Sequence, residues 1–271
     1  MHVPASTAGG TIPLPGSCTY RARGHLTAPS GSTWVPPRSA WYQDYYGTPY
    51  PTDKCDMIAL PDFAAGAMEN VGCITYREDV LLVDPVTSTQ IGMQTVADVI
   101  SHELADMWFG DLVTMKWWNG IWLNEAFATF MEVACCDAYR PRWKRWATFS
   151  LERSRRVDID TFASPAPAEF PVLAPADCEG MFDVLTYQKG GALCLCSSST
   201  SAKIISAQGV NYYLRHPHLW QHRHLRPVGC DRVAPTRRCP VRRIMDSWIW
   251  QGGYPLVSVQ ASTGLRGRCC S

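Results

Sequence analysis

The 271-residue chain has no long apolar run and no excess of charge of either sign. No stretch reaches the roughly 20 consecutive apolar residues that cross a bilayer. The start, MHVPASTAGGTIPLP, lacks the basic flank and apolar segment of a signal peptide. The 25 basic and 24 acidic residues give a net charge near zero. Such a charge does not favour binding to nucleic acid or to an anionic membrane. We therefore expect a cytoplasmic protein with no nucleic-acid partner and no membrane partner.

The twelve cysteines show little pairing. Half of them precede residue 193, at positions 18, 55, 73, 135, 136 and 178, and none of these forms a C-x-x-C pair. We expect buried free thiols there rather than a disulfide framework or a second metal site.

Residues 41–192 have regular strand and helix patterns. DMIAL (56–60) and CITYREDVLLV (73–83) are rich in β-branched and aromatic residues and predict strands. The segment between them, PDFAAGAMENVG, predicts a glycine-rich turn or an edge segment.

Two helices should follow the strands. Apolar residues spaced by four and seven predict a helix over 93–109, which stops before Gly110. An apolar stripe predicts a second helix over 123–139, which ends before Pro141.

The first helix carries HELAD (102–106), which differs by one letter from the zinc-protease pattern H-E-x-x-H. His102 and Asp106 share a helix face, one turn apart, and Glu103 lies beside them. Glu125 opens the second helix, with eighteen residues between it and Asp106. Antiparallel helices can bring the four side chains around one ion, although His102 considered alone could equally be an ordinary histidine.

Longer motifs extend this pattern. WFGDLVTMKWWNGIWLNEAFATF follows HELAD, and GAMEN stands upstream at 66–70. Together they resemble the aminopeptidase N family of zinc metallopeptidases, gluzincins with a thermolysin-like catalytic domain. The resemblance covers about 41–192 and returns in VRRIMDSWIWQGGYPLVSV (241–259).

The resemblance implies a role for each matching residue. One Zn²⁺ would be held by His102, Asp106 and Glu125, and Glu103 would activate the metal-bound water and then pass its proton to the leaving amine. Tyr187, in LTYQKGG, would stabilise the oxyanion rather than serve as an ordinary core aromatic. The exopeptidase signature would be Gly66, Ala67, Met68, Glu69 and Asn70, with Glu69 holding the free α-amino group. The implied partners are peptide substrates with a free N-terminus.

Asp106 departs from the family pattern, which has histidine at this position. Carboxylate oxygen does bind zinc, but aspartate is shorter than histidine. One histidine with two carboxylates also cancels the charge of the ion, so the bound water should be less acidic. We expect weaker zinc binding, slower hydrolysis and a shift towards oxygen-preferring metals.

Residues 216–232 hold four of the seven histidines and could suggest a metal tract. Back-translated with free codon choice and read one base later, they give THTYGNTDTSDLWDAI, which looks like family sequence. Residues 193–209 behave in the same way in another frame. We interpret 193–240 as aberrant sequence that arose by frame slips, and Asp106 could belong with this damage.

The fold prediction is α+β, an incomplete thermolysin-like catalytic domain with a small sheet beside the two metal-bearing helices. We expect an irregular remnant of an N-terminal β domain (1–40), the catalytic domain (41–259) and a tail (260–271). The predicted function is a zinc-dependent aminopeptidase with activity impaired by Asp106. The alternatives are a non-catalytic peptide- or metal-binding remnant and a non-functional product of a degraded gene.

Overall fold

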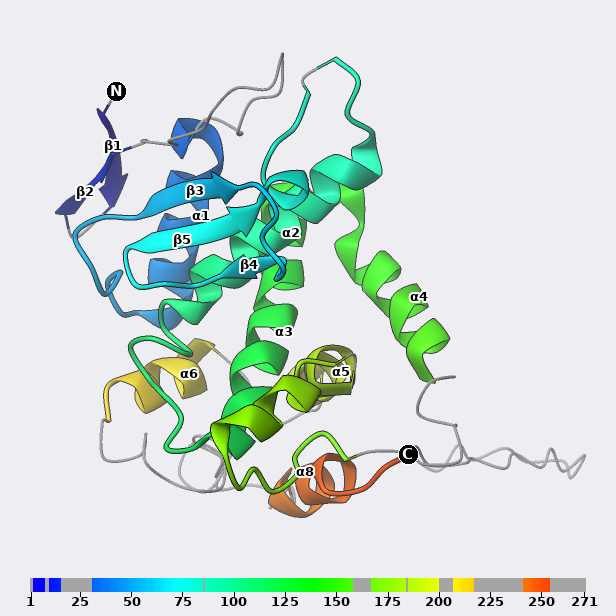
Figure 1. The fold of residues 1–271 in the computed structure, drawn as a ribbon. Coiled ribbons are helices and arrows are strands. Elements are labelled where there is room, and N and C mark those ends of the chain that lie inside the picture. The colour runs from blue at the N-terminus through cyan, green and yellow to red at the C-terminus, as the bar shows by residue number, and fades with distance from the viewer. Residues whose placement is uncertain are drawn as a thin grey trace, which may run out of the picture.

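A computed structural model describes residues 2–7, 10–15, 31–84, 86–157, 167–183, 185–199, 207–216 and 241–253. In Figure 1 a small sheet lies against a group of helices, with α3 running through the group. The fold is α+β, as the sequence predicts. Among the described residues, no helix is both long and apolar enough to cross a bilayer.

The sheet has three strands in the order β3-β5-β4. Strand β3 (Asp56–Leu60) runs parallel to β5 (Cys73–Arg77), and β4 (Ala67–Met68) pairs antiparallel with β5. Alternate residues of β3 and β5 are buried, because successive side chains of a strand point to opposite faces. The strand predicted at 56–60 and the edge segment at 61–72 are confirmed.

The second predicted strand was too long. It ends at Arg77, and a 3-10 helix, η1 (Glu78–Val80), follows. Arg77 Nε donates to Asp79 Oδ1 over 2.6 Å, and Leu82 N donates to Glu78 O over 2.8 Å. These local bonds replace the strand ladder, so Leu81 is buried in a turn rather than in the sheet.

Helices α2 (Gln90–Asp106) and α3 (Ile121–Tyr139) form the centre of the molecule. Helix α2 begins and ends three residues before the predicted 93–109, because Thr89 Oγ1 caps its start by accepting from Gly92 N. Helix α3 begins two residues before the predicted 123–139 and ends at Tyr139, as expected.

The first part of the chain also contributes to this centre. Strands β1 (His2–Thr7) and β2 (Gly10–Pro15) pair antiparallel, and α1 (Gly31–Tyr46) runs across the boundary at residue 40 that the sequence suggested. Tyr42 of α1 is fully buried, and its hydroxyl donates to Ser101 O in α2 over 2.7 Å. Helix α1 therefore packs against α2 and α3, the helices that carry HELAD and Glu125.

The remaining described elements are η2 (Trp118–Gly120), η3 (Pro141–Trp143), α4 (Arg145–Val157), η5 (Pro175–Met181), the π-helix η6 (Leu185–Lys189), α5 (Gly190–Ser199), α6 (Ala207–Leu214) and α8 (Val241–Ile249). Of these, η2, η3, α4, η6 and α5 pack on α3, whereas α6 packs on α1, α8 on α5 and η5 on η2. Of the six cysteines expected to be buried free thiols, five are described and all five are free. Four of them are buried, Cys73 is partly buried, and Cys18 lies outside the described residues.

Most of the tract interpreted as aberrant sequence lies outside the described residues, as does the 260–271 tail. Its first part forms α5, where Leu193 and Cys194 are buried and Cys196 is exposed. Of the histidines at 216–224 only His216 is described, two residues after the end of α6. The frame-slip interpretation stays a prediction.

Candidate metal centre

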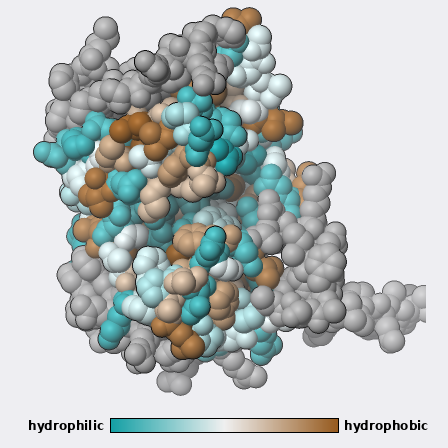
Figure 2. All heavy atoms as spheres, viewed as in Figure 1, coloured by the Kyte–Doolittle hydropathy of each residue, from teal (hydrophilic) through white to brown (hydrophobic). Residues whose placement is uncertain are grey.

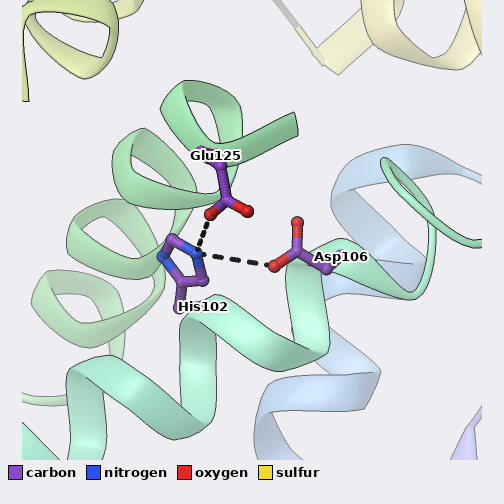
Figure 3. A group of neighbouring side chains, drawn as sticks. All are labelled: His102, Asp106 and Glu125. Carbon is purple, nitrogen blue, oxygen red and sulfur yellow. Dashed lines mark hydrogen bonds and ion pairs between the residues drawn. The ribbon is translucent and has the colours of Figure 1, made fainter. Parts of the chain in front are cut away.

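The packed helices α2 and α3 bring three side chains to one point, shown in Figure 3. His102 Nε2 lies 3.1 Å from Glu125 Oε2 and 3.5 Å from Asp106 Oδ2. The three residues offer ligand atoms that all lie within 4.8 Å of one another. Their side chains are buried. The residues that the sequence predicted as metal ligands are therefore brought together.

Burial and mutual charge shift the proton affinities of this group. Burial by itself lowers the pKa of His102, but Asp106, Glu125 and Glu132 surround the ring and raise it well above its usual value. Desolvation raises the pKa of Asp106 well above its usual value, with nearby carboxylates adding to the effect. Burial likewise raises the pKa of Glu103 to about 8. The site thus gathers negative charge in a poorly solvated place and favours a cation or protons there.

Glu69 reaches the same place from the edge of the sheet. The backbone of 66–70 runs alongside β5, with Arg77 N donating to Gly66 O and Cys73 N donating to Asn70 O. Asn124 Nδ2, on α3 beside Glu125, donates to Glu69 Oε1 over 3.4 Å. Glu69, Glu103 and Asp106 form a second group whose ligand atoms lie within 4.8 Å of one another.

The other residues of the GAMEN motif hold this edge. Ala67 pairs with Tyr76 and Met68 with Thr75 in the β4–β5 register. Asn70 Nδ2 donates to Thr75 Oγ1 over 3.1 Å. In Figure 2 hydrophilic side chains lie across the middle of this face, between the strands and α5.

Tyr187 lies over the histidine. Its ring stacks on His102 with centroids 5.8 Å apart and an interplanar angle of 24°. Burial raises the pKa of Tyr187, and the charge of Glu125 and a hydrogen bond to it raise that pKa further. The phenol is therefore protonated at neutral pH and able to donate.

The π-helix that carries Tyr187 is held close to α3 by small residues. A Cβ at Gly190 would lie 2.4 Å from Ala126 Cβ, and one at Gly191 would lie 3.1 Å from Thr129 Cγ2. Asp183 Oδ1 accepts from Leu185 N and Thr186 N, which fixes the start of the turn. The QKGG sequence thus allows the approach that sets Tyr187 beside Glu125.

The sequence reasoning missed Glu132. Its Oε2 lies 2.9 Å from His102 Nδ1, the ring nitrogen that does not face the other ligands. Glu132 is seven residues after Glu125, two turns along the same face of α3. That spacing was the available signal.

The donors present fit a divalent metal ion. One imidazole and two carboxylates form a set that zinc accepts. Asp106 Oδ1 is buried and has no hydrogen-bond partner among the described residues. Such an oxygen is costly to bury unless it binds a proton or a cation.

Comparison with known proteins agrees with this geometry. Residues 37–248 match the Peptidase family M1 domain. Aminopeptidase M1 of Arabidopsis thaliana is 38% identical over 223 residues, which are 82% of this chain and 25% of that protein. Aminopeptidase N of Lactococcus lactis subsp. cremoris is 41% identical over 225 residues, with shares of 81% and 26%. For aminopeptidase N of Homo sapiens the identity is 39% over 236 residues, with shares of 83% and 24%.

The chain spans about a quarter of the length of these curated relatives. The match to the family domain covers helices α2 and α3, strand β4 of the GAMEN motif and the π-helix of Tyr187. The chain belongs to peptidase family M1.

Proposed function

We propose that this chain is a zinc-dependent aminopeptidase domain that removes N-terminal residues from peptides, with its activity impaired by Asp106. The observation that carries the proposal is the meeting of His102, Asp106 and Glu125 within 4.8 Å at the contact of α2 and α3. Relatives named aminopeptidase N support the reaction class.

The metal would be held by His102, Asp106 and Glu125. Zinc in such a set acidifies a bound water molecule and polarises the scissile carbonyl. Glu103 is the carboxyl next to these residues, and a carboxyl in this position can take up a proton and then release it. We assign it the role of general base and then of general acid towards the leaving amine.

Two further residues would act on the substrate. Glu69 lies at the sheet edge within reach of Glu103, and its carboxylate would pair with the α-ammonium group of the peptide. Such pairing restricts cleavage to the first residue. Tyr187 would donate a hydrogen bond to the developing oxyanion, an effect of about 3 kcal/mol for a comparable donor.

Asp106 sets the expected level of activity. The two carboxylates of the set balance the charge of a zinc ion, so the ion withdraws less electron density from a bound water than with two histidines. The same change favours the second candidate function, a peptide- or metal-binding remnant without catalysis. A product without any function is the third alternative.

The test uses the full chain and its Glu103→Gln and His102→Asn variants. Zinc content after dialysis and hydrolysis of an aminoacyl chromogenic substrate are measured for each. We expect the parent to bind zinc and hydrolyse the substrate slowly. Glu103→Gln should keep zinc and lose hydrolysis, whereas His102→Asn should lose both.

The alternatives give different results. Zinc binding with no hydrolysis in the parent supports the binding remnant. A parent that binds no zinc and does not hydrolyse the substrate contradicts the proposal.

A further inference from the structure

Asp106 belongs to two groups of ligand atoms. One group is His102, Asp106 and Glu125, and the other is Glu69, Glu103 and Asp106. The atoms of the second group also lie within 4.8 Å of one another. Two ligands of one ion can be separated by at most about twice the metal–oxygen distance, which is roughly 4–5 Å from the smallest to the largest of the hard cations. The second group therefore has the dimensions of a cation site.

Two buried oxygens point to a ligand for the second group. Glu103 Oε2 and Asp106 Oδ1 have no hydrogen-bond partner among the described residues. Glu103 is 6% exposed and Asp106 is 1% exposed. In Figure 3 only one of the two Asp106 oxygens faces the His102 ring. The other is free to bind a second ion, which a histidine at this position could not do.

The charge of the site leads to the same conclusion. Four carboxylates, those of Glu69, Glu103, Asp106 and Glu125, share this place with one imidazole. A single dication cannot compensate four carboxylates in a poorly solvated site, so the remaining carboxyl groups hold either protons or a second cation.

We propose that Glu69, Glu103 and Asp106 form a second, oxygen-only site for a hard divalent cation such as Mn²⁺, which would share Asp106 with the first site. The ligands offer no nitrogen or sulfur, and carboxylate oxygen suits Mg²⁺, Ca²⁺ and Mn²⁺. Of these, Mn²⁺ also tolerates a neighbouring imidazole-containing site and can be followed by its spin.

The cation at this site opposes the proposed peptidase reaction. It occupies Glu69 and Glu103, the carboxylates assigned to the substrate's ammonium group and to proton transfer. Bound Mn²⁺ and a peptide N-terminus then compete for the same negative charge. This consequence rests on the proposed function, whereas the binding of the cation does not.

The experiment titrates Mn²⁺ into the full chain loaded with one equivalent of zinc, with free Mn²⁺ followed by electron paramagnetic resonance. We expect one Mn²⁺ to bind per chain. Glu69→Gln should weaken this binding by about tenfold or more, the effect of losing about 1.4 kcal/mol. Asp111→Asn is the control, because Asp111 lies close enough to Glu69 to feel its charge but belongs to neither group. It should change Mn²⁺ affinity far less.

Circular dichroism of each variant checks that it is folded. Absence of Mn²⁺ binding overturns the proposal. An equal loss of affinity in Glu69→Gln and Asp111→Asn also overturns it. That result would attribute Mn²⁺ binding to the overall negative charge of the region rather than to Glu69, Glu103 and Asp106.

A third variant separates this inference from the proposed function. His102→Asn removes the imidazole of the first group and leaves the second group intact. Retained Mn²⁺ binding in His102→Asn, with zinc binding lost, supports an independent oxygen-only site. If the parent binds no zinc but binds Mn²⁺ in a Glu69-dependent way, the zinc aminopeptidase proposal fails and the second site stands. If zinc binds and Mn²⁺ does not, the second-site proposal fails and the zinc aminopeptidase proposal stands.

Discussion

Glu132 Oε2 lies 2.9 Å from His102 Nδ1, while His102 Nε2 faces Asp106 and Glu125. A carboxylate at Nδ1 holds a proton on that nitrogen, which leaves the Nε2 lone pair available for a metal in the neutral ring. Asp98 on α2, which receives two bonds from Arg145, adds its charge near Glu132. The Glu132 contact thus holds the imidazole from the side opposite Asp106 and Glu125.

The first prediction concerns this contact. Glu132→Gln removes the charge that orients His102, so zinc affinity should fall by roughly 10–100-fold, the usual effect of losing such a partner. Isothermal titration with zinc measures the change. Glu179→Gln, at an exposed acidic residue of η5, is the control and should leave the affinity unaltered. Unchanged zinc binding in Glu132→Gln would show that Glu132 does not orient the ligand.

Helix periodicity predicts the meeting of His102 and Asp106, whereas the roles of Glu125, Glu69 and Tyr187 come from the resemblance to the family. The spacing of His102 and Asp106 places them on one face, and the stripe of α3 turns Glu125 towards them. Glu132 has the same periodicity, yet a lone glutamate two turns away looks like an ordinary surface residue. Only the packed helices show that it meets Nδ1.

The element ends were harder to predict for local reasons. The apolar residues 81–83 continue the strand pattern in the sequence. The hydrogen bonds of Glu78 and Asp79, however, form a turn that ends the strand before residue 81. No residue pattern in the sequence predicts the π-helix of Tyr187, because its formation depends on close packing against α3. Tertiary contacts decide such elements.

The second prediction tests this approach. Gly190→Ala places a Cβ 2.4 Å from Ala126 Cβ, so it should lower the free energy of unfolding by about 1–3 kcal/mol, as overpacking does. Gly180→Ala is the matched control, because no atom lies within 4 Å of the added Cβ. Urea denaturation compares both with the parent. Equal stability of the two variants would mean that α5 can move away from α3 without cost.

The third prediction concerns pH. Burial raises the pKa of Glu169 to about 7 against a usual value of 4.5, although Trp122 and Asn119 donate to its carboxylate. The folded state therefore holds a proton that the unfolded state has released between about pH 4.5 and 7. The contribution of Glu169 to stability is present at low pH and is lost as pH rises through this window.

Glu169→Gln keeps an acceptor for Trp122 and has no proton to lose. Its free energy of unfolding should fall less steeply between pH 5 and pH 7 than that of the parent. The difference in slope should correspond to at most one bound proton. Urea denaturation in the presence of a chelator measures both slopes, with Glu179→Gln as the exposed control. Parallel slopes in the parent and Glu169→Gln would contradict the assigned shift.

The fourth prediction separates Tyr187 from zinc binding. Tyr187→Phe keeps the ring that stacks on His102 and removes only the hydroxyl. Zinc content should stay at the parental level, while kcat falls by about 10²–10³, the effect of losing one oxyanion donor. Tyr212→Phe on α6 is the control. A change in zinc content equal to the change in rate would assign Tyr187 a structural role instead.

The fifth prediction concerns the residue that sets this chain apart. Asp106→His restores the longer side chain and leaves only one carboxylate among the ligands, so the bound water becomes more acidic. Zinc affinity should rise by about tenfold or more, and hydrolysis of the aminoacyl substrate should rise with it. Asp106→Ala should leave both close to the parental level, because a weak ligand contributes little.

The two proposals about Asp106 then predict opposite changes in one variant. A neutral histidine has only one nitrogen with a free lone pair, so Asp106→His should lose the second, Mn²⁺ site while it gains zinc affinity. Both metals are titrated against the same preparation of the full chain. If the parent already binds zinc as tightly as Asp106→His and hydrolyses the substrate as fast, aspartate is a competent ligand at this position and the site is not impaired. A gain in zinc affinity without loss of Mn²⁺ would place the second cation on Glu69 and Glu103 alone, away from residue 106.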